Sequence, residues 1–552
     1  MSHYKQLIAI ISIAFLFSCS EKEHIDEKGN FNTSKSINIT NDSDQLDSIT
    51  AEFPMAKTEE LKEEIQQFYN EFGNRSRWLY QKESAPITDF LLKELQNAMD
   101  YGLYPSTYAA EELQSRIYFL YQNENRTEAE IAALDAQITA TFLLFTKHLI
   151  HGRIVPKSYE KNIWRTESQT TKLKMNKILR GMTDSQELRS LFDTIHPHHP
   201  YFEKLRNHLR KVNAEKPRDI KTFEIQNVLD FKVGYTDSTV ALIRHNLEQW
   251  NIPITEVSNP FVVDSSLLKS IALFQKSRSI KVDGLPGQNT LTYLNMTHDK
   301  LQDLIALNLE RIRWLPNDFG SNYLIVNIPE FILRAFNEGK IDLKMKVVVG
   351  KKFNPTPIFH DTLKYLVFRP TWTVPQSIIE NEMIPKLAKN KSHYSEKFEL
   401  FESDQEISFE SVKWDSDKVK NRYFVMRQKS GPTNALGLVK FIMPNDLSIY
   451  LHDTPADRYF EEEERALSHG CIRLDEPELL ANYVLRNDDN WDKEKIHEAL
   501  FEGETKQVNL KNELPVQIAY LTTWADDNDD LVICEDVYGF DKLQLAELEK
   551  FK

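Results

Sequence analysis

Cysteine is scarce in this chain. Only three cysteines, Cys19, Cys471 and Cys534, occur among its 552 residues. Small secreted domains compensate for a small hydrophobic core with dense disulfide frameworks, and three cysteines exclude that class. Cys534 ends the apolar run Leu531–Cys534, which is typical of a buried strand. The sequence alone leaves open a disulfide between Cys471 and Cys534.

Positive charge is also in deficit. The chain has 68 Lys and Arg against 83 Asp and Glu, a formal net charge of −15. Binding to nucleic acid needs a basic surface, so we expect no nucleic-acid partner. A hydrophobic content of 41% and an aromatic content of 11% indicate a globular protein. At this length, several domains are expected rather than one core.

The apolar run near the N-terminus is too short to span a bilayer, which takes about 20 residues. The run Leu7–Phe17 follows Lys5 and fits the hydrophobic part of a secretory signal. Because Leu16 to Cys19 resembles a lipobox, we expect residues 1–18 to be a lipoprotein signal peptide and Cys19 to be lipidated. The alternative is an ordinary cleaved signal that happens to end near a cysteine. Residues 19–52 are polar and predict a flexible tether.

The resulting localisation is the cell envelope, as a periplasmic protein held to a membrane by its lipid. Ser20 after the lipidated cysteine gives no obvious signal for retention in the inner membrane, which favours the outer membrane. We expect a monomer.

Three regions follow the tether. Residues 53–230 show apolar residues at helical spacing and predict a helical scaffold domain. Residues 235–298 place Phe274-Gln275 before an Asp283-Gly284 turn and a Thr290-Leu291 pair. That arrangement resembles the small three-helix peptidoglycan-binding module. Residues 304–545 contain alternating β-branched runs and predict a mostly-β domain, interrupted at about 380–420 by a charged, helix-prone insertion.

Neither of two candidate metal sites is convincing. His196, His198 and His199 lie in a proline-rich loop, where three imidazoles cannot easily converge. The acidic turn at Asp526–Asp530 lacks the spaced glycine and closing glutamate of an EF-hand. We therefore expect no metal and no cofactor.

The chemistry-bearing segment is Ser468-His469-Gly470-Cys471-Ile472-Arg473. A cysteine is nucleophilic as its thiolate, and a nearby imidazole can take the thiol proton. Either His452 or His469 provides such an imidazole. Gly470 removes a side chain from the turn, which lets backbone N–H groups approach a developing oxyanion. Arg473 offers a fixed positive charge for a substrate carboxylate or for the loop.

This segment, with a histidine upstream, resembles the signature of the YkuD-domain L,D-transpeptidases. The order of domains is similar to the large YcbB-type members, including an inserted capping subdomain. Further blocks agree at Val347–Gly350, Thr356–Phe359, Arg369–Ile378 and Asn434–Gly437, the last together with Lys440-Phe441. The resemblance implies an α+β multidomain protein, with a helical scaffold, a three-helix peptidoglycan-binding module and a mostly-β catalytic domain.

The resemblance also implies roles for individual residues. Cys471 would be the nucleophile and His452 the general base. His469 would help to build the oxyanion site with the backbone N–H groups of Gly470 and Cys471. Arg473 would hold a substrate carboxylate or the loop, and Ser468 would make local hydrogen bonds. Tyr450 and Trp372 would line the donor cleft, although both could equally belong to the core.

One position departs from the family. Many members have glycine after the first histidine, where this chain has Asp453. We expect a backbone carbonyl to orient His452.

The implied reaction is a transpeptidation on peptidoglycan stems. A thioester at Cys471 would form on a tetrapeptide donor, and the amine of an acceptor stem would resolve it into a 3→3 cross-link. Penems and carbapenems should acylate Cys471. Two alternatives are an L,D-carboxypeptidase, in which water replaces the acceptor, and a non-catalytic peptidoglycan-binding anchor.

Overall fold

The computed structural model describes residues 36–39, 58–71, 73–154, 163–165, 185–197, 199–278, 280–316, 319–416, 418–419 and 422–552. The predicted signal peptide, Cys19 and most of the predicted tether lie outside these residues, as does His198. The chain divides into two compact units, residues 1–92 with 111–143, and residues 93–110 with 144–552.

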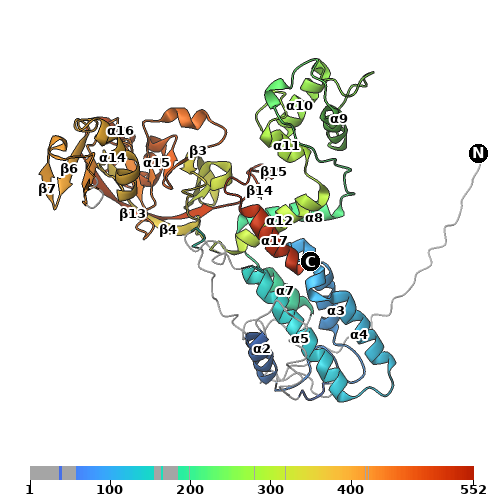
Figure 1. Ribbon diagram of the computed structural model, residues 1–552. Helices are drawn as coiled ribbons and strands as arrows, with labels where there is room; N and C mark the ends of the chain where they lie inside the picture. The colour runs from blue at the N-terminus through green and yellow to red at the C-terminus, as the bar shows by residue number, and fades with distance from the viewer. Residues whose placement is uncertain are drawn as a thin grey trace, which may run out of the picture. The chain divides into compact units, whose positions relative to one another are not determined.

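Helices make up the N-terminal half of the chain (Figure 1). Their bounds are α2 Thr58–Glu71, α3 Pro86–Gln96, α4 Ala110–Gln122, α5 Glu128–His151, α7 Ser185–Ile195 and α8 Pro200–Ala214. Although α5 is long and apolar enough to cross a membrane, most of its apolar window is buried within the protein, as in a core helix. His199 caps α8, where its Nδ1 accepts the N–H of Tyr201. That contact gives this histidine a structural role.

A buried carboxylate organises the first unit. Asp135 on α5 accepts the backbone N–H groups of Arg77, Trp78 and Leu79 and the Tyr69 hydroxyl. It thereby fixes a loop that has no regular hydrogen-bond ladder of its own.

Three helices form a bundle in residues 235–298, as expected: α9 Ser238–Gln249, α10 Ser265–Ser277 and α11 Gln288–Leu294 (Figure 1). Gln275 holds the turn between the last two. Its Oε1 accepts the N–H groups of Asp283 and Gly284, and its Nε2 donates to Thr290. The helix α12 His298–Arg313 follows.

The C-terminal half is built on a nine-stranded sheet in the order β11-β3-β12-β10-β9-β4-β13-β1-β2. Because β2 also pairs with β3, the sheet closes on itself around a large apolar core. The strands are β1 Tyr323–Asn327, β2 Ile332–Asn337, β3 Lys340–Gly350, β4 Phe359–Phe368, β9 Val439–Ile442, β10 Leu451–His452, β11 Ala466–Ser468, β12 Ile472–Leu474 and β13 Lys506–Ala519.

Three further helices and a hairpin complete this half: α15 Pro477–Leu485, α16 Lys493–Phe501, α17 Phe540–Leu548, and β14 Thr523–Ala525 with β15 Leu531–Ile533. The acidic turn lies at the tip of that hairpin, where Asp526 accepts the N–H groups of Asn528 and Asp530. The helical N-terminal region and the mostly-β C-terminal domain confirm an α+β multidomain fold.

The insertion differs from the expectation of a helix-prone segment. It begins with α13 Gln376–Ile378, a π-helix at Ile379–Met383 and α14 Ile384–Lys389. It then forms its own sheet, in the order β5-β8-β6-β7. The strands are β5 Trp372–Thr373, β6 Phe398–Glu402, β7 Gln405–Ile407 and β8 Val425–Gln428. Strand β8 lies beyond the expected end of the insertion at about residue 420 but belongs to it, and the insertion has a separate apolar core.

Candidate active site

Three adjacent strands set the site. β10 lies between β9 and β12, and His452 pairs in register with Lys440 on one side and with Arg473 on the other. Residues that are directly opposite in neighbouring strands project from the same face of a sheet. Lys440, His452 and Arg473 therefore form one row, which we call the basic row.

Cys471 precedes β12 and belongs to a tight turn. The Ser468 hydroxyl accepts the N–H of Gly470 at 3.1 Å and donates to the carbonyl of Cys471 at 2.6 Å. Gly470 has φ of +120°, a backbone conformation that favours glycine. Ser468 thus makes the local hydrogen bonds that were expected of it. Because Gly470 N–H is already bonded, only one of the two N–H groups assigned to the oxyanion site is unoccupied.

The other group is the N–H of Cys471. It has no hydrogen-bond partner within the described part of the chain. An N–H without a partner beside a nucleophile is suited to bind the oxyanion of a tetrahedral intermediate.

His452 is buried, and its Nδ1 lies 2.5 Å from the carbonyl oxygen of Asp453. A carbonyl only accepts, so Nδ1 carries the proton and Nε2 keeps its lone pair. This confirms that a backbone carbonyl orients the ring. Burial lowers the pKa of His452 to about 3; the hydrogen bond to Asp453 raises this pKa in part, and the charges of Arg473 and Lys440 lower it. The ring is therefore a neutral base at ordinary pH.

The Asp453 side chain has a different function. Its carboxylate accepts the N–H groups of Leu438 and Thr454, each at 2.6 Å. A side chain at Gly437, which has φ of +60°, would collide with that carboxylate. Asp453 therefore fastens the turn before β9 to the strand that carries His452.

The Cys471 thiol is partly exposed, and its Sγ lies 3.6 Å from the carbonyl oxygen of Ser448. Burial raises the pKa of Cys471, while Tyr450 and Arg473 lower it in part. The thiol is thus neutral at rest. Among the described residues no hydrogen bond joins Cys471 to His452, although Cys471 directly precedes β12, which pairs with the strand of His452. Catalytic hydrogen bonds are often long before substrate binds.

Tyr450 lies beside the thiol, and Trp372 lies beside Tyr450. The Tyr450 hydroxyl interacts with both Cys471 and Trp372, and burial raises the pKa of Tyr450. The Tyr450 ring centre is 5.6 Å from that of His452. The structure thus brings Tyr450 and Trp372 to the site.

His469 points elsewhere. Its Nε2 lies 3.0 Å from Oε1 of Glu382, on the π-helix of the insertion, and both side chains are about half exposed. Its imidazole therefore contacts the insertion, and no contact to Cys471 is present among the described residues.

Two segments of the chain match known protein families. Residues 321–506 match the family model of the L,D-transpeptidase catalytic domain, YkuD, and residues 63–209 match that of the Scaffold domain. Residues 321–506 are an L,D-transpeptidase catalytic domain.

A curated protein of Haemophilus influenzae, named provisionally as an L,D-transpeptidase, is 32% identical over 247 residues. The match covers 44% of this chain and about half (49%) of the relative's length.

Solved L,D-transpeptidases are also similar. One from Mycobacterium smegmatis is 13% identical, with 36% of this chain and 58% of that chain covered at a TM-score of 0.18. One from Stackebrandtia nassauensis is 14% identical, with 53% and 97% covered at 0.20. At such TM-scores the family assignment rests on the family models and not on these structures.

The basic row of the L,D-transpeptidase domain contains one residue, Lys440, that the sequence analysis did not assign to the site. Lys440 has an ammonium 5.9 Å from the Tyr450 ring centre, and burial lowers the pKa of Lys440. Neither Lys440 nor Arg473 makes an ion pair with a described carboxylate. The Arg473 guanidinium instead lies 5.8 Å from the Tyr459 ring centre, and its Nε is buried without a partner in the described chain. The sequence signal for Lys440 was its place beside Phe441 in a block that resembles the family, which gave it no role in the site.

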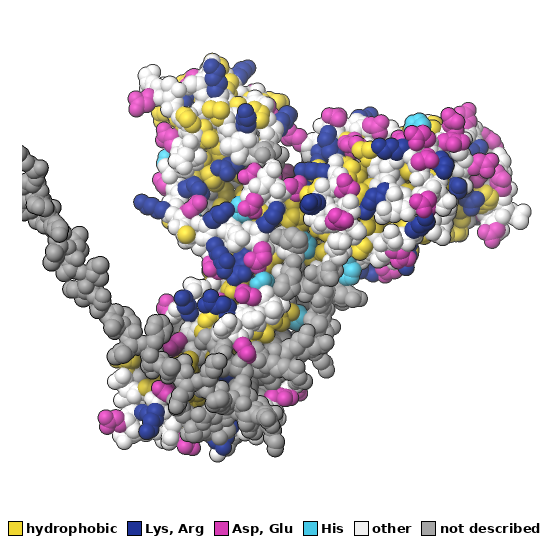
Figure 2. Space-filling view, turned by 180° about the vertical axis from the view of Figure 1, so that it is seen from behind, with side chains coloured by type: hydrophobic (Ala, Val, Ile, Leu, Met, Phe, Trp, Pro, Cys, Tyr) yellow, Lys and Arg dark blue, Asp and Glu magenta, His cyan; other side chains and the backbone are white. Residues whose placement is uncertain are grey.

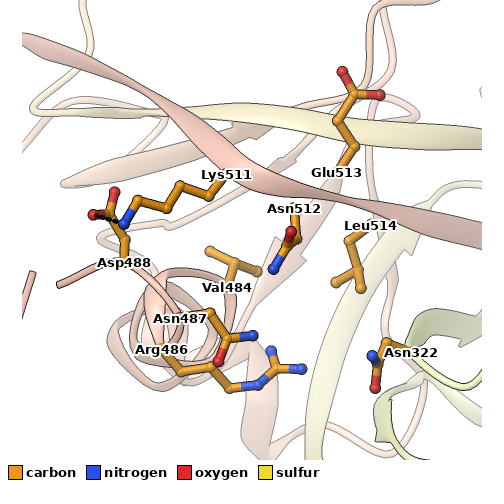
Figure 3. A pocket seen from close by; sticks show the side chains of 9 residues that line it. All are labelled: Asn322, Val484, Arg486, Asn487, Asp488, Lys511, Asn512, Glu513 and Leu514. Carbon is orange, nitrogen blue, oxygen red and sulfur yellow. Dashed lines mark ion pairs between the residues drawn. The ribbon is translucent and has the colours of Figure 1, made fainter.

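Neither metal nor disulfide chemistry is built into the described part of the domain. No group of three or more potential ligand side chains converges there, and Cys471 and Cys534 are both free thiols. A separate pocket lies between α15 and β13, where Lys511 pairs with Asp488 (Figure 3). None of the predicted site residues lines that pocket.

Charge outside the site is mixed. On the face shown in Figure 2, acidic and basic side chains of the described residues are interspersed.

Proposed function

We propose that this protein is an L,D-transpeptidase that forms 3→3 cross-links in peptidoglycan through a thioester at Cys471. The observation that supports it best is the combination around that thiol: an unoccupied N–H at Cys471, a neutral base at His452 and an unpaired cation at Arg473. These are the oxyanion donor, the proton acceptor and the carboxylate anchor that acyl transfer from a peptide needs.

In the first half-reaction, Cys471 Sγ attacks the carbonyl carbon of the third residue of a tetrapeptide stem. Because thiol and imidazole are both neutral at rest, the thiol proton passes to His452 Nε2 as the C–S bond forms. The N–H of Cys471 stabilises the oxyanion. The intermediate then collapses, the peptide C–N bond breaks, and His452 returns the proton to the nitrogen of the departing D-alanine.

In the second half-reaction, the side-chain amine of a diaminopimelate on a neighbouring stem attacks the thioester. His452 takes a proton from that amine, an amide forms, and the Cys471 thiol is regenerated. The basic row would hold the carboxylates of the donor stem, and Tyr450 with Trp372 would line its cleft. His469 would remain a contributor through its backbone or through its contact with Glu382.

The insertion at residues 372–428 is suited to keep water from the thioester, because it reaches the active-site motif through Glu382 and His469. Attachment to a membrane through a lipid on Cys19 would place the enzyme in the periplasm at the cell wall. No metal or organic cofactor takes part in this scheme.

The test incubates the purified chain with disaccharide-tetrapeptide muropeptides and identifies the products by mass. A cross-linked dimer with loss of D-alanine is expected. Release of a trimmed tripeptide monomer alone would instead indicate an L,D-carboxypeptidase. Cys471→Ala must abolish either product, and unchanged product formation by that variant would contradict catalysis by Cys471. Absence of both products with the wild-type chain would leave a role as a peptidoglycan-binding anchor.

A further inference from the structure

A buried hydroxyl lies behind the catalytic turn. Thr356 is fully buried in the loop between β3 and β4. Its Oγ1 accepts the N–H of Gly350 at 2.8 Å and donates to the carbonyl oxygen of Gly470 at 2.7 Å. No other side chain among the described residues is hydrogen-bonded to that carbonyl.

The loop that carries Thr356 is itself held rigidly. The Tyr538 hydroxyl accepts the N–H of Thr356 at 3.1 Å and donates to the carbonyl of Gly350 at 2.8 Å. A side chain at Gly350 would collide with the backbone of Asn354 and Thr356, so the loop folds closely over that glycine. Thr356 Oγ1 is thus fixed from both ends of its loop and cannot follow the catalytic turn if that turn moves.

The Gly470 carbonyl and the Cys471 N–H belong to one peptide unit. That unit is planar and trans, so its C=O and N–H point in opposite directions. Fixing the direction of the carbonyl therefore fixes the direction of the N–H. Gly470, with φ of +120°, adds no side chain that would hold the plane. The Thr356 hydroxyl is bonded at the carbonyl edge of this unit, and the unoccupied N–H of Cys471 points away from the opposite edge.

We propose that Thr356 is a positioning residue for acyl transfer, which aims the Cys471 N–H at the oxyanion through its hydrogen bond to the Gly470 carbonyl. The inference rests on the proposed function, because it concerns the tetrahedral intermediate of that reaction. Thr356 touches no substrate and does not act on the thiol or on His452.

Two reactions of Cys471 separate this role from a general structural one. Acylation by a carbapenem passes through a tetrahedral oxyanion, whereas alkylation by iodoacetamide displaces iodide and forms none. Both need an accessible, reactive thiol. Thr356→Val keeps the shape of the side chain and removes its hydroxyl. Acylation of this variant should slow by about tenfold to a hundredfold, because deletion of an oxyanion donor itself slows such reactions by about 10²–10³-fold. Alkylation should stay within about twofold of wild type, because the thiol is unchanged.

Two control variants and one replacement variant complete the experiment. Thr356→Ser keeps the hydroxyl and should restore most of the acylation rate. Thr88→Val removes another fully buried threonine hydroxyl, which donates to the carbonyl of Trp78, and should leave both rates unchanged. If Thr356→Val does not fold, Thr356→Ala is measured in its place.

Each outcome is decisive. Equal acylation by wild type and folded Thr356→Val overturns the inference. A parallel loss of acylation and alkylation also overturns it, because Thr356 would then merely maintain the site. If wild type itself is alkylated but not acylated, the proposed function fails first, and the inference fails with it.

Discussion

The Asp135 cluster and the basic row use buried polar groups in opposite ways. Asp135 is fully buried, yet its carboxylate accepts three backbone N–H groups and one hydroxyl. In the basic row, Lys440 and Arg473 have no described carboxylate partner, and the N–H of Cys471 has no acceptor. Satisfied polar groups hold a loop in place, whereas unsatisfied ones are available to a substrate. The difference separates structural from catalytic burial within one chain.

The largest expected effect is at the base. His452→Ala should slow acylation of Cys471 by about 10²–10⁴-fold, the usual contribution of general base catalysis. The measurement is the rate of adduct formation with a carbapenem, followed by mass. His497→Ala removes an exposed histidine on α16 and serves as the control. Equal losses in both variants would contradict a special role for His452.

Removing the hydrogen bonds of Asp135 should lower the stability of the fold and not the rate of acylation. Asp135→Ala leaves several buried N–H groups without an acceptor and should lower the free energy of unfolding by about 3 kcal/mol or more. Urea denaturation measures this loss. At temperatures where the variant is folded, its acylation rate should equal that of wild type. A change in acylation without a change in stability would reverse the contrast.

Removing one cation of the row should have a smaller effect. Lys440→Met should reduce acylation by a peptide donor about fivefold, since an ion pair in contact with solvent contributes on the order of 1 kcal/mol. The control is Lys364→Met, an exposed lysine in the neighbouring strand β4 that pairs with Glu513. A rate for Lys440→Met equal to that of its control would mean that Arg473 alone holds the carboxylate.

The smallest effect lies in the pH dependence. Because the pKa of His452 is lowered to about 3, the base stays neutral as pH falls and is lost only near that value. Because burial raises the pKa of Cys471, alkylation by iodoacetamide should still rise with pH above the usual thiol value of 9.0. A thiolate–imidazolium pair would instead show a plateau at neutral pH. Alkylation rates measured between about pH 5 and pH 10 distinguish a neutral thiol from a thiolate–imidazolium pair.

Local sequence predicted the groups that lie on short segments. The motif around Cys471, the more distant His452 and the backbone carbonyl that orients it could all be predicted. Lys440 could not, because only the pairing of β9 with β10 brings it to His452, and pairing between strands is not written in either strand alone. Thr356 was recognised within a family block, but its bond to Gly470 spans 114 residues.

The insertion shows the same limit. Its charged residues predicted helices, and α13, the π-helix and α14 are present. Its strands β6 and β7 are short and polar at their turn, so the alternation that marks a strand is weak there. Only the structure shows that β8 joins them rather than the main sheet.

The insertion enters and leaves the domain at one place. Trp372 and Thr373 in β5 pair with Gln428 and Arg427 in β8, so the first and last strands of the insertion lie side by side. A segment whose two ends are already adjacent can be exchanged for a short turn without separating the strands that flank it. Modular exchange of such segments between relatives would alter what reaches the thiol while leaving the catalytic sheet intact.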